Sequence, residues 1–183
     1  VGTESQVAEL KKMRFAGYAV KATCLAPEEG GGRKGGVVHF YPQQWEKESK
    51  VQWREVMKGR ILVAQVELDK PTWIIGAYSP HEEDKRSEFW QKIKELRREA
   101  ADRGIQVVAG GDWNAVPRPE EDRQQGRSGE HPGDKLLPGA VRGWEDVTRK
   151  SGWTYTDSVK VWSRIDSWWV SGGVKATLDR RTG

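Results

Sequence analysis

The chain shows two different spacings of apolar residues, each typical of one kind of secondary structure. Residues 81–103 have the helical spacing, with apolar side chains on one side and lysines and arginines on the other. The apolar positions are Phe89, Trp90, Ile93, Leu96 and Ala100. Gly104 comes next and is a typical helix-ending residue. The pattern predicts an amphipathic helix over 81–103.

Elsewhere, short runs rich in Val, Ile, Trp and Tyr lie between turn residues, which favours strands. These runs are residues 36–41, 60–68, 72–78, 105–109 and 164–170, and residues 18–24 also look extended. Shorter helices are predicted at 5–14, where Ser5 can act as a cap, and around 140–150. Strands alternating with helices predict an α/β (α+β) layered fold, and the length suits one domain over 1–183.

Three segments lack a clear period. Residues 45–57 fit either a helix, which their charges permit, or an irregular edge strand, which Val51 and Trp53 suit. Residues 28–36 are rich in glycine and charge and predict a loop. Residues 117–138 are rich in Pro, Gly and charged side chains and predict a long loop. Unstructured loops of that length in compact domains are often functional.

Composition then narrows the class of protein. Ten tryptophans supply apolar surface that a disordered chain would not carry, and we expect Trp90, Trp144 and Trp168 to lie in the core. A net charge of +4 is compatible with an anionic polymer as partner. Cys24 is the one cysteine, which excludes an internal disulfide and a cysteine-based zinc site and fits an intracellular protein. No stretch is long and apolar enough to predict a membrane span.

The clearest chemical signal is in residues 106–116, where an apolar run passes through two glycines into Asp112 and Asn114. A carboxylate at a strand end can hold a divalent metal or take a proton from water, and a carboxamide can bind both a phosphate oxygen and a nucleophile. Phosphoester hydrolysis needs such a pair. The alternative is a strand followed by an Asx-type turn, since Gly, Asp and Asn are ordinary turn residues.

Two further segments carry side chains of interest. Asp166 enters an apolar strand, where a carboxylate is costly without a partner. The alternative for Asp166 is a strand-end carboxylate bonded to Arg164 or to backbone. Tyr78 ends another predicted strand, and Arg86 follows in the predicted helix. Taken alone, both are ordinary residues for their positions.

Taken in order, these segments resemble the endonuclease/exonuclease/phosphatase superfamily, in particular the apurinic-type endonuclease domains of non-LTR (LINE-type) retrotransposons. The segments are Gly36-Val37-Val38, Gly59-Arg60-Ile61-Leu62, Tyr78-Ser79-Pro80, Arg86 with Phe89-Trp90, Gly110-Gly111-Asp112-Trp113-Asn114 and Arg164-Ile165-Asp166. The loop over 120–129 also resembles the retroelement branch. The resemblance implies a four-layer sandwich of two mixed β-sheets flanked by helices, incomplete at both termini.

The resemblance also implies roles and a cofactor. Members hydrolyse phosphoesters with Mg2+ or Mn2+. Asp112 would orient or deprotonate the attacking water, Asn114 would help hold phosphate and nucleophile, and Tyr78 would donate a hydrogen bond to the scissile phosphate. Asp166 would orient a catalytic histidine. Arg86 would contact phosphate or have a structural role.

The sequence departs from the family pattern near both ends. The family's first strand with its Asn is not found, and Glu4 is the candidate metal ligand, with a helix-dipole role as the alternative. No Ser-Asp-His block precedes Gly183. His39, His81 and His131 do not replace it, and we expect structural or solvent roles for them. We therefore expect a truncated domain with reduced activity.

The sequence thus predicts a metal-dependent DNA endonuclease (nickase) domain of a retroelement. Arg123 and Arg127, in the retroelement-like loop, are the candidate DNA contacts besides Arg86. We expect a monomer without membrane association, a nuclear location, and a reverse transcriptase domain outside this chain. The alternatives are a small-molecule or lipid phosphoesterase of the same superfamily and an inactive fragment that binds nucleic acid.

Overall fold

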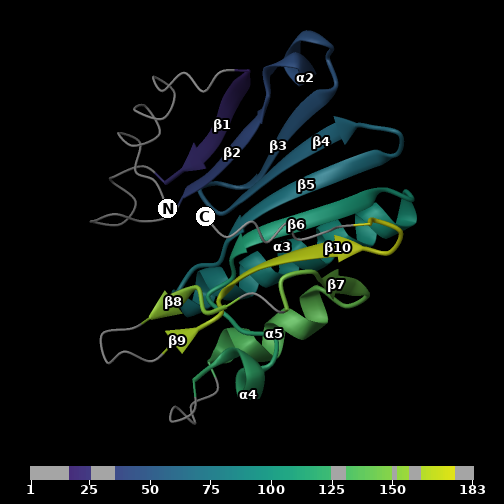
Figure 1. The fold of residues 1–183 in the computed structure, drawn as a ribbon. Helices are drawn as coiled ribbons and strands as arrows, with labels where there is room; N and C mark the ends of the chain where they lie inside the picture. The colour runs from purple at the N-terminus through teal and green to yellow at the C-terminus, as the bar shows by residue number, and fades with distance from the viewer. Residues whose placement is uncertain (1–16, 26–35, 125–130, 150–151, 157–161, 176–183) are drawn as a thin grey trace.

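The computed structural model of the chain describes residues 17–25, 36–124, 131–149, 152–156 and 162–175, and its centre is a six-stranded mixed sheet (Figure 1). The strand order is β3-β4-β5-β6-β10-β7. These strands are β3 (Val51–Met57), β4 (Ile61–Glu67), β5 (Pro71–Tyr78), β6 (Gln106–Asp112), β7 (Trp144–Asp146) and β10 (Asp166–Ser171). Strands β5 and β6 run parallel, and the other four neighbouring pairs run antiparallel.

Helix α3 (Glu83–Asp102) connects β5 to β6 and covers one face of the sheet (Figure 1). Parallel neighbours require such a crossover, and a helix is its usual form. The buried face of α3 packs on the apolar residues of β4, β5 and β6. Trp90 of α3 stacks on Trp113, which directly follows β6, with ring centroids 5.9 Å apart. Helix α5 (Pro132–Ala140) lies beside α3 on the same face. This helix layer and the sheet form the core.

The strands β1 (Tyr18–Cys24) and β2 (Gly36–Pro42) form an antiparallel hairpin that packs on the opposite face of the sheet. The rings of His39 and Tyr41 lie 5.4 and 4.9 Å from the ring of Trp53, centroid to centroid. The short helix α2 (Gln43–Lys47) connects β2 to β3. The hairpin is therefore the second sheet of the sandwich in the described ranges.

Alternation along the strands decides which side chains face the helices. In β5, Ile75 and Ala77 belong to the core under α3, so Tyr78 points to the opposite face. By the same alternation, Asp112 points to the other face of the sheet from the buried Ala109 of β6. Asp166 likewise points to the other face from the buried Trp169 of β10. All three polar side chains therefore lie on the face of the sheet that carries the hairpin.

The structure confirms the α/β class, the amphipathic helix and the strands predicted around 18–24, 36–41, 60–68, 72–78, 105–109 and 164–170. It also decides the segment that fitted two interpretations, because residues 45–57 divide between α2 and the edge strand β3. The helix expected at 5–14 lies outside the described residues. No helix in the described ranges has the length and apolar character that a membrane crossing requires.

Two predictions in the C-terminal half were wrong. The supposed loop over 117–138 contains α4 (Pro119–Asp122) and most of α5. Helix α5 is held by a capping box, in which His131 accepts from the N–H of Gly133 and Asp134 accepts from the N–H of His131. The helix expected at 140–150 is absent from the described part of that segment, because β7 pairs there with β10 and Gly143 turns the chain at a φ of +83°.

The prediction of three core tryptophans was correct in part. Trp90 is fully buried and Trp144 packs at the edge of the core, but Trp168 is 46% exposed. Its neighbour Trp169 is buried instead, because adjacent strand residues point to opposite faces. Besides the main sheet, β8 (Tyr155–Thr156) and β9 (Trp162–Ser163) form a small antiparallel pair.

Candidate active site

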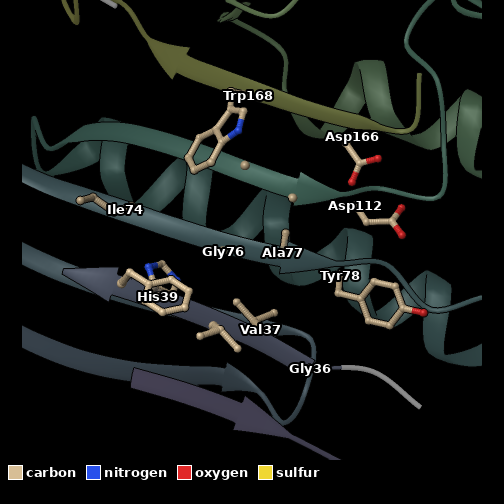
Figure 2. Close-up of a pocket in the computed structure, with 14 residues that line it drawn as sticks. Gly36, Val37, His39, Ile74, Gly76, Ala77, Tyr78, Asp112, Asp166 and Trp168 are labelled. Atoms are coloured by element: carbon tan, nitrogen blue, oxygen red, sulfur yellow. The ribbon is translucent and has the colours of Figure 1, made fainter. Parts of the chain in front are cut away.

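Three of the predicted site residues form a row across neighbouring strands. Tyr78, the last residue of β5, is the register partner of Asp112, the last residue of β6. Asp112 in turn is the register partner of Asp166, the first residue of β10. Figure 2 shows the three side chains together at one end of a groove. The sheet therefore brings together residues that are far apart in the sequence.

The two glycines before Asp112 are required by close packing on both of their sides. A Cβ on Gly111 would lie 1.9 Å from the carbonyl oxygen of Ala77, and the φ of Gly111 is +146°. A Cβ on Gly110 would lie 2.3 Å from the indole of Trp168. The Gly-Gly pair thus allows β5 and Trp168 to approach β6 closely, just before the carboxylate.

The turn after β6 joins Asp112 to Asn114. The N–H of Asn114 donates to Oδ1 of Asp112 at 2.9 Å, which is an Asx turn. Asn114 has a φ of +45°, a left-handed conformation that Asn tolerates better than most residues. Its side-chain amide donates to the carbonyl of Ser79 at 2.6 Å, which ties the end of β6 to the residue after Tyr78. The turn interpretation of this motif is confirmed, and it leaves the predicted chemical roles open.

The carboxyl group of Asp112 has a perturbed acidity. Burial raises its pKa to about 6, the hydrogen bond from the N–H of Asn114 opposes that change, and the nearby negative charge of Asp166 adds to it. A carboxylate with this pKa is mostly ionised at neutral pH, yet it is a stronger base than an exposed aspartate. Asp112 is therefore suited to accept a proton from water.

The groove beside these residues has a volume of about 540 Å3. Its walls come from β2 on one side and from β5, β6 and β10 on the other (Figure 2). Tyr78, Asp112 and Asp166 form its polar end, while Phe40 and Trp168 are exposed aromatic residues along its apolar part. His39 also lines the groove, but its Nε2 lies 3.2 Å from the carbonyl oxygen of Leu62, and burial lowers its pKa.

Two of the predicted phosphate-binding arginines, Arg86 and Arg123, do not line the groove. Arg86 is buried, and its guanidinium donates to the carbonyl of His81 in the turn before α3. Arg123 forms an ion pair with Asp134 at 3.0 Å, which ties the chain after α4 to the first turn of α5. Both arginines therefore have structural contacts. Glu4 and Arg127 lie outside the described residues.

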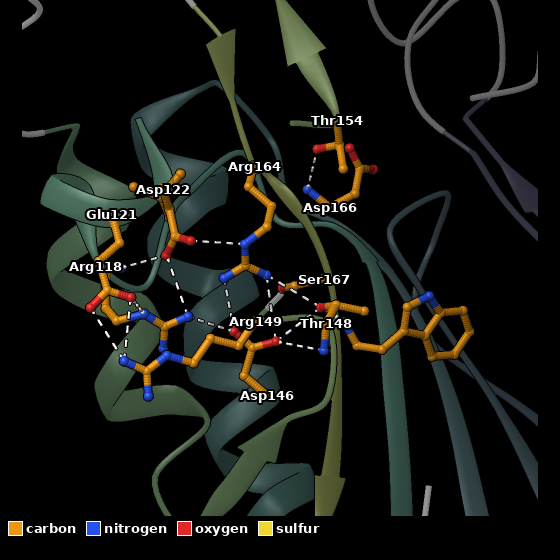
Figure 3. A network of polar contacts seen from close by, with 12 residues as sticks. Arg118, Glu121, Asp122, Asp146, Thr148, Arg149, Thr154, Arg164, Asp166 and Ser167 are labelled. Carbon is orange, nitrogen blue, oxygen red and sulfur yellow. Dashed lines mark hydrogen bonds and ion pairs between the residues drawn. The ribbon is translucent and has the colours of Figure 1, made fainter. Parts of the chain in front are cut away.

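The guanidinium of Arg164 bonds to other carboxylates than Asp166, so the part of the alternative that paired Asp166 with Arg164 was wrong. Arg164 is fully buried and donates instead to Asp122 through Nε and to Asp146 through Nη2, both at 2.8 Å (Figure 3). Arg118 joins the same network at 3.0 Å from Asp146. The backbone N–H of Asp166 donates to Oγ1 of Thr154 at 3.1 Å. The Asp166 carboxylate is therefore not used in this network.

The histidines have the structural roles expected where the structure shows their contacts. His131 caps α5, and burial together with the nearby Arg86 lowers its pKa, which keeps the ring neutral for that role. Sequence reasoning missed one residue near the site, Arg60, whose guanidinium lies 4.7 Å from the ring centroid of Tyr78. The Gly59-Arg60-Ile61-Leu62 block contributed to the resemblance, but nothing local indicated which ring Arg60 would meet.

The polar end of the groove offers two carboxylates as oxygen donors for a metal ion. Carboxylate oxygens from Asp112 and Asp166 suit hard cations such as Mg2+, which commonly binds one or two carboxylates together with water and substrate phosphate. Within the described ranges, no group of three or more His, Cys, Asp and Glu side chains could hold a metal.

Residues 8–179 match the family described as the Endonuclease/Exonuclease/phosphatase family. No curated protein matches the sequence.

Solved structures share the fold at low identity. The endonuclease domain of TRAS1, a telomere-specific non-LTR retrotransposon, aligns with a TM-score of 0.59 and 15% identity over 86% of this chain and 68% of that domain. The catalytic domain of Xenopus laevis APE2 aligns with a TM-score of 0.63 and 16% identity, over 87% of this chain and 68% of that chain. A mannosyl-6-phosphatase from Bacteroides thetaiotaomicron aligns with a TM-score of 0.54 and 15% identity, over 93% of this chain and 68% of that chain.

Proposed function

Because this chain belongs to the endonuclease/exonuclease/phosphatase family, we propose that it hydrolyses phosphodiester bonds of DNA at the polar end of the groove. The observation that carries this proposal is the row of Tyr78, Asp112 and Asp166 on three neighbouring strands. The row places a proton acceptor between a hydrogen-bond donor and a second carboxylate. An attack of water on a phosphodiester uses a proton acceptor for the water and a hydrogen-bond donor for the phosphate.

The proposed roles follow from the position of each group. Asp112 accepts a proton from the attacking water, since burial makes it a stronger base than an exposed aspartate. Tyr78 donates its hydroxyl to a phosphate oxygen. Asn114 holds the turn that aligns Asp112, and the part of its carboxamide not engaged by the Ser79 carbonyl is proposed to help hold phosphate and nucleophile. Asp166 supplies the negative charge that orients and stabilises a cationic partner such as an imidazolium.

A divalent cation completes the proposed chemistry. Mg2+ or Mn2+ would neutralise charge on the phosphate, and Glu4 is the residue proposed to hold it. The oxygen donors at the strand ends are compatible with either ion.

DNA is favoured over a small phosphoester for two reasons. The net charge of +4 suits a polyanion, and the loop over 120–129 resembles the retroelement branch. The fold similarity to the TRAS1 endonuclease domain supports the proposal that the chain comes from a retroelement. In that proposal it is a nickase that leaves a 3′ hydroxyl for a reverse transcriptase. A nuclear monomer is part of this proposal.

A second candidate is a phosphatase acting on a small phosphoester. The fold similarity to the mannosyl-6-phosphatase supports it, because one family fold serves both substrate classes. A third candidate is a domain that binds nucleic acid without turnover.

One experiment separates the three. Protein expressed from the complete reading frame is incubated with supercoiled plasmid, and in parallel with a sugar phosphate, in the presence of Mg2+ or EDTA. Magnesium-dependent conversion of the plasmid to the nicked circle supports the DNA nuclease. Release of phosphate from the sugar phosphate without nicking would replace it with the phosphatase. Plasmid binding in a gel-shift assay with no product in either reaction would leave only the binding function.

A further inference from the structure

The position of Arg60 is fixed by the turn that contains it. Gly59 has a φ of +64°, and its N–H donates to Oγ1 of Thr23 in β1 at 2.8 Å. A Cβ on Gly59 would lie 2.7 Å from the side chain of Leu25 and 2.8 Å from its backbone nitrogen. The turn is thus pressed against the hairpin, so the Arg60 side chain starts from a rigid backbone.

Arg60 and Tyr78 are joined both through the backbone and through their side chains. The N–H of Tyr78 donates to the carbonyl of Arg60 at 2.9 Å. The Arg60 guanidinium lies over the Tyr78 ring, with Cζ 4.7 Å from the ring centroid. This distance is within the range of a cation–π contact. The guanidinium therefore packs over the ring that carries the hydroxyl.

The charge of Arg60 is only partly compensated. The residue is 3% exposed, and its Nη1 has no hydrogen-bond partner in the part of the chain that the structure describes. The carboxylate of Glu82 lies 3.8 Å from Nη2, which is longer than a hydrogen bond. Water screens a buried cation little, so its charge acts on the Tyr78 ring that it overlies.

We infer that Arg60 is the positioning residue for Tyr78, orienting its phenol and strengthening the hydroxyl as a hydrogen-bond donor to an anionic phosphate oxygen. A positive charge above the ring draws electron density from it, so the phenolic hydrogen becomes more positive. The inference rests on the proposed function, because it assigns to Tyr78 a contact with the substrate phosphate. Arg60 itself touches the ring and not the substrate.

A double-mutant cycle tests whether Arg60 acts through the hydroxyl. Arg60→Lys keeps the charge but loses the planar stacking group. Tyr78→Phe keeps the ring and loses only the hydroxyl. Both single variants are expected to lower kcat/KM for magnesium-dependent plasmid nicking, each by about tenfold or more. The double variant is expected to be no slower than Tyr78→Phe alone, since Arg60 has no hydroxyl left to act through. Effects that multiply in the double variant would overturn the inference.

The matched control is Arg54→Lys. Arg54 also lies over an aromatic ring, 6.0 Å from the centroid of Trp73, and is remote from Tyr78 in the contacts it makes. Its replacement should leave kcat/KM unchanged in both the wild-type and the Tyr78→Phe backgrounds. Thermal unfolding of each variant verifies that it is folded at the assay temperature. If Arg60→Lys is unfolded at that temperature, Arg60→Gln takes its place, because Gln keeps a planar group without the charge.

Binding separates this inference from the proposed function. The same four proteins are titrated with a fluorescein-labelled DNA duplex in EDTA, and the dissociation constants form a second cycle. If the wild-type protein nicks no DNA, the proposed nuclease function fails. Even then, the inference predicts that Arg60→Lys weakens binding of the DNA duplex in the wild-type background and not in the Tyr78→Phe background. If it persists there undiminished, Arg60 does not act through Tyr78.

Discussion

Asp112 and Asp166 are directly opposite residues of the antiparallel strands β6 and β10, and both carboxylates lie on the face of the sheet that carries the groove. Two carboxylates so placed resist ionising together. The negative charge of Asp166 adds to the effect of burial, and the pKa of Asp112 rises to about 6. This pair makes the acidity of Asp112 adjustable by a single substitution.

The first prediction concerns the pH dependence of activity. If Asp112 is the proton acceptor, kcat/KM should fall about tenfold for each pH unit below 6, where the carboxylate is protonated. Asp166→Asn removes the neighbouring negative charge and so lowers the pKa of Asp112. The residual activity of this variant should therefore begin to fall at a lower pH than that of the wild-type protein. Initial rates of nicking between pH 4.5 and 8 would measure the acid limb of each protein. An acid limb at the same pH in the two proteins would contradict the assignment.

The second prediction concerns stability. The pKa of Asp112 is raised in the folded protein above its ordinary value of 3.8, so the folded state binds more protons than the unfolded state between those two values. This group therefore lowers the free energy of unfolding as pH rises from about 4 to 6, and the cost persists above 6. Asp112→Asn should stabilise the protein at pH 7.5 by roughly 1–3 kcal/mol.

Urea unfolding in EDTA, at pH 7.5 and near pH 4, would measure this gain. The gain should be largest at pH 7.5 and should shrink near pH 4. An equal gain at both pH values would show that removal of the charge is not its cause.

The third prediction concerns the buried network of Arg164. Arg164→Ala leaves Asp122 and Asp146 buried without their main partner, and hydrogen bonds from Arg164 help hold the pKa of Asp146 below its usual range despite burial. The variant should lose about 3–5 kcal/mol of stability. The control is Arg149→Ala, whose ion pair with Glu121 is exposed and whose loss should cost under about 0.5 kcal/mol. Similar unfolding midpoints for the two variants would contradict the importance of the network.

The fourth prediction concerns the glycine before Asp112. Gly111→Ala places a Cβ against the carbonyl oxygen of Ala77 at a φ that L residues rarely adopt. Strands β5 and β6 must then separate, at a cost of about 2–4 kcal/mol. Gly139→Ala is the control, because its Cβ would meet nothing within 4 Å and a helical Gly→Ala change stabilises slightly. Circular dichroism melts would compare the two, and a stable Gly111→Ala protein would exclude the close approach.

Local patterns were enough to predict much of the fold. The strands and α3 follow from alternation and helical period, which a short window of sequence contains. Helix α5 was missed because its capping residue is His131, which is not a typical cap, and because four of its nine residues are Pro or Gly. Trp168 was assigned to the core because two adjacent tryptophans in a strand face opposite ways, and the sequence does not say which faces in.

Long-range relationships could not be predicted in the same way. The partners of Arg164 are 42 and 18 residues away in the sequence, so the sequence suggested its neighbour Asp166 instead. Asp112 was predicted as a site residue from its local motif and by resemblance, and the register of β5, β6 and β10 then placed it beside Tyr78 and Asp166. The overlap of Arg60 and Tyr78 depends on how a turn and a strand end meet in space.

The most direct test of the central claim compares wild-type protein with Asp112→Asn in magnesium-dependent nicking of supercoiled plasmid, with Asp69→Asn as a control for loss of an exposed carboxylate. Rates are measured at pH 7.5 under single-turnover conditions. The account predicts that Asp112→Asn stays folded and loses about 10³-fold or more in rate, while Asp69→Asn keeps the wild-type rate. Nicking by Asp112→Asn at the wild-type rate would contradict it.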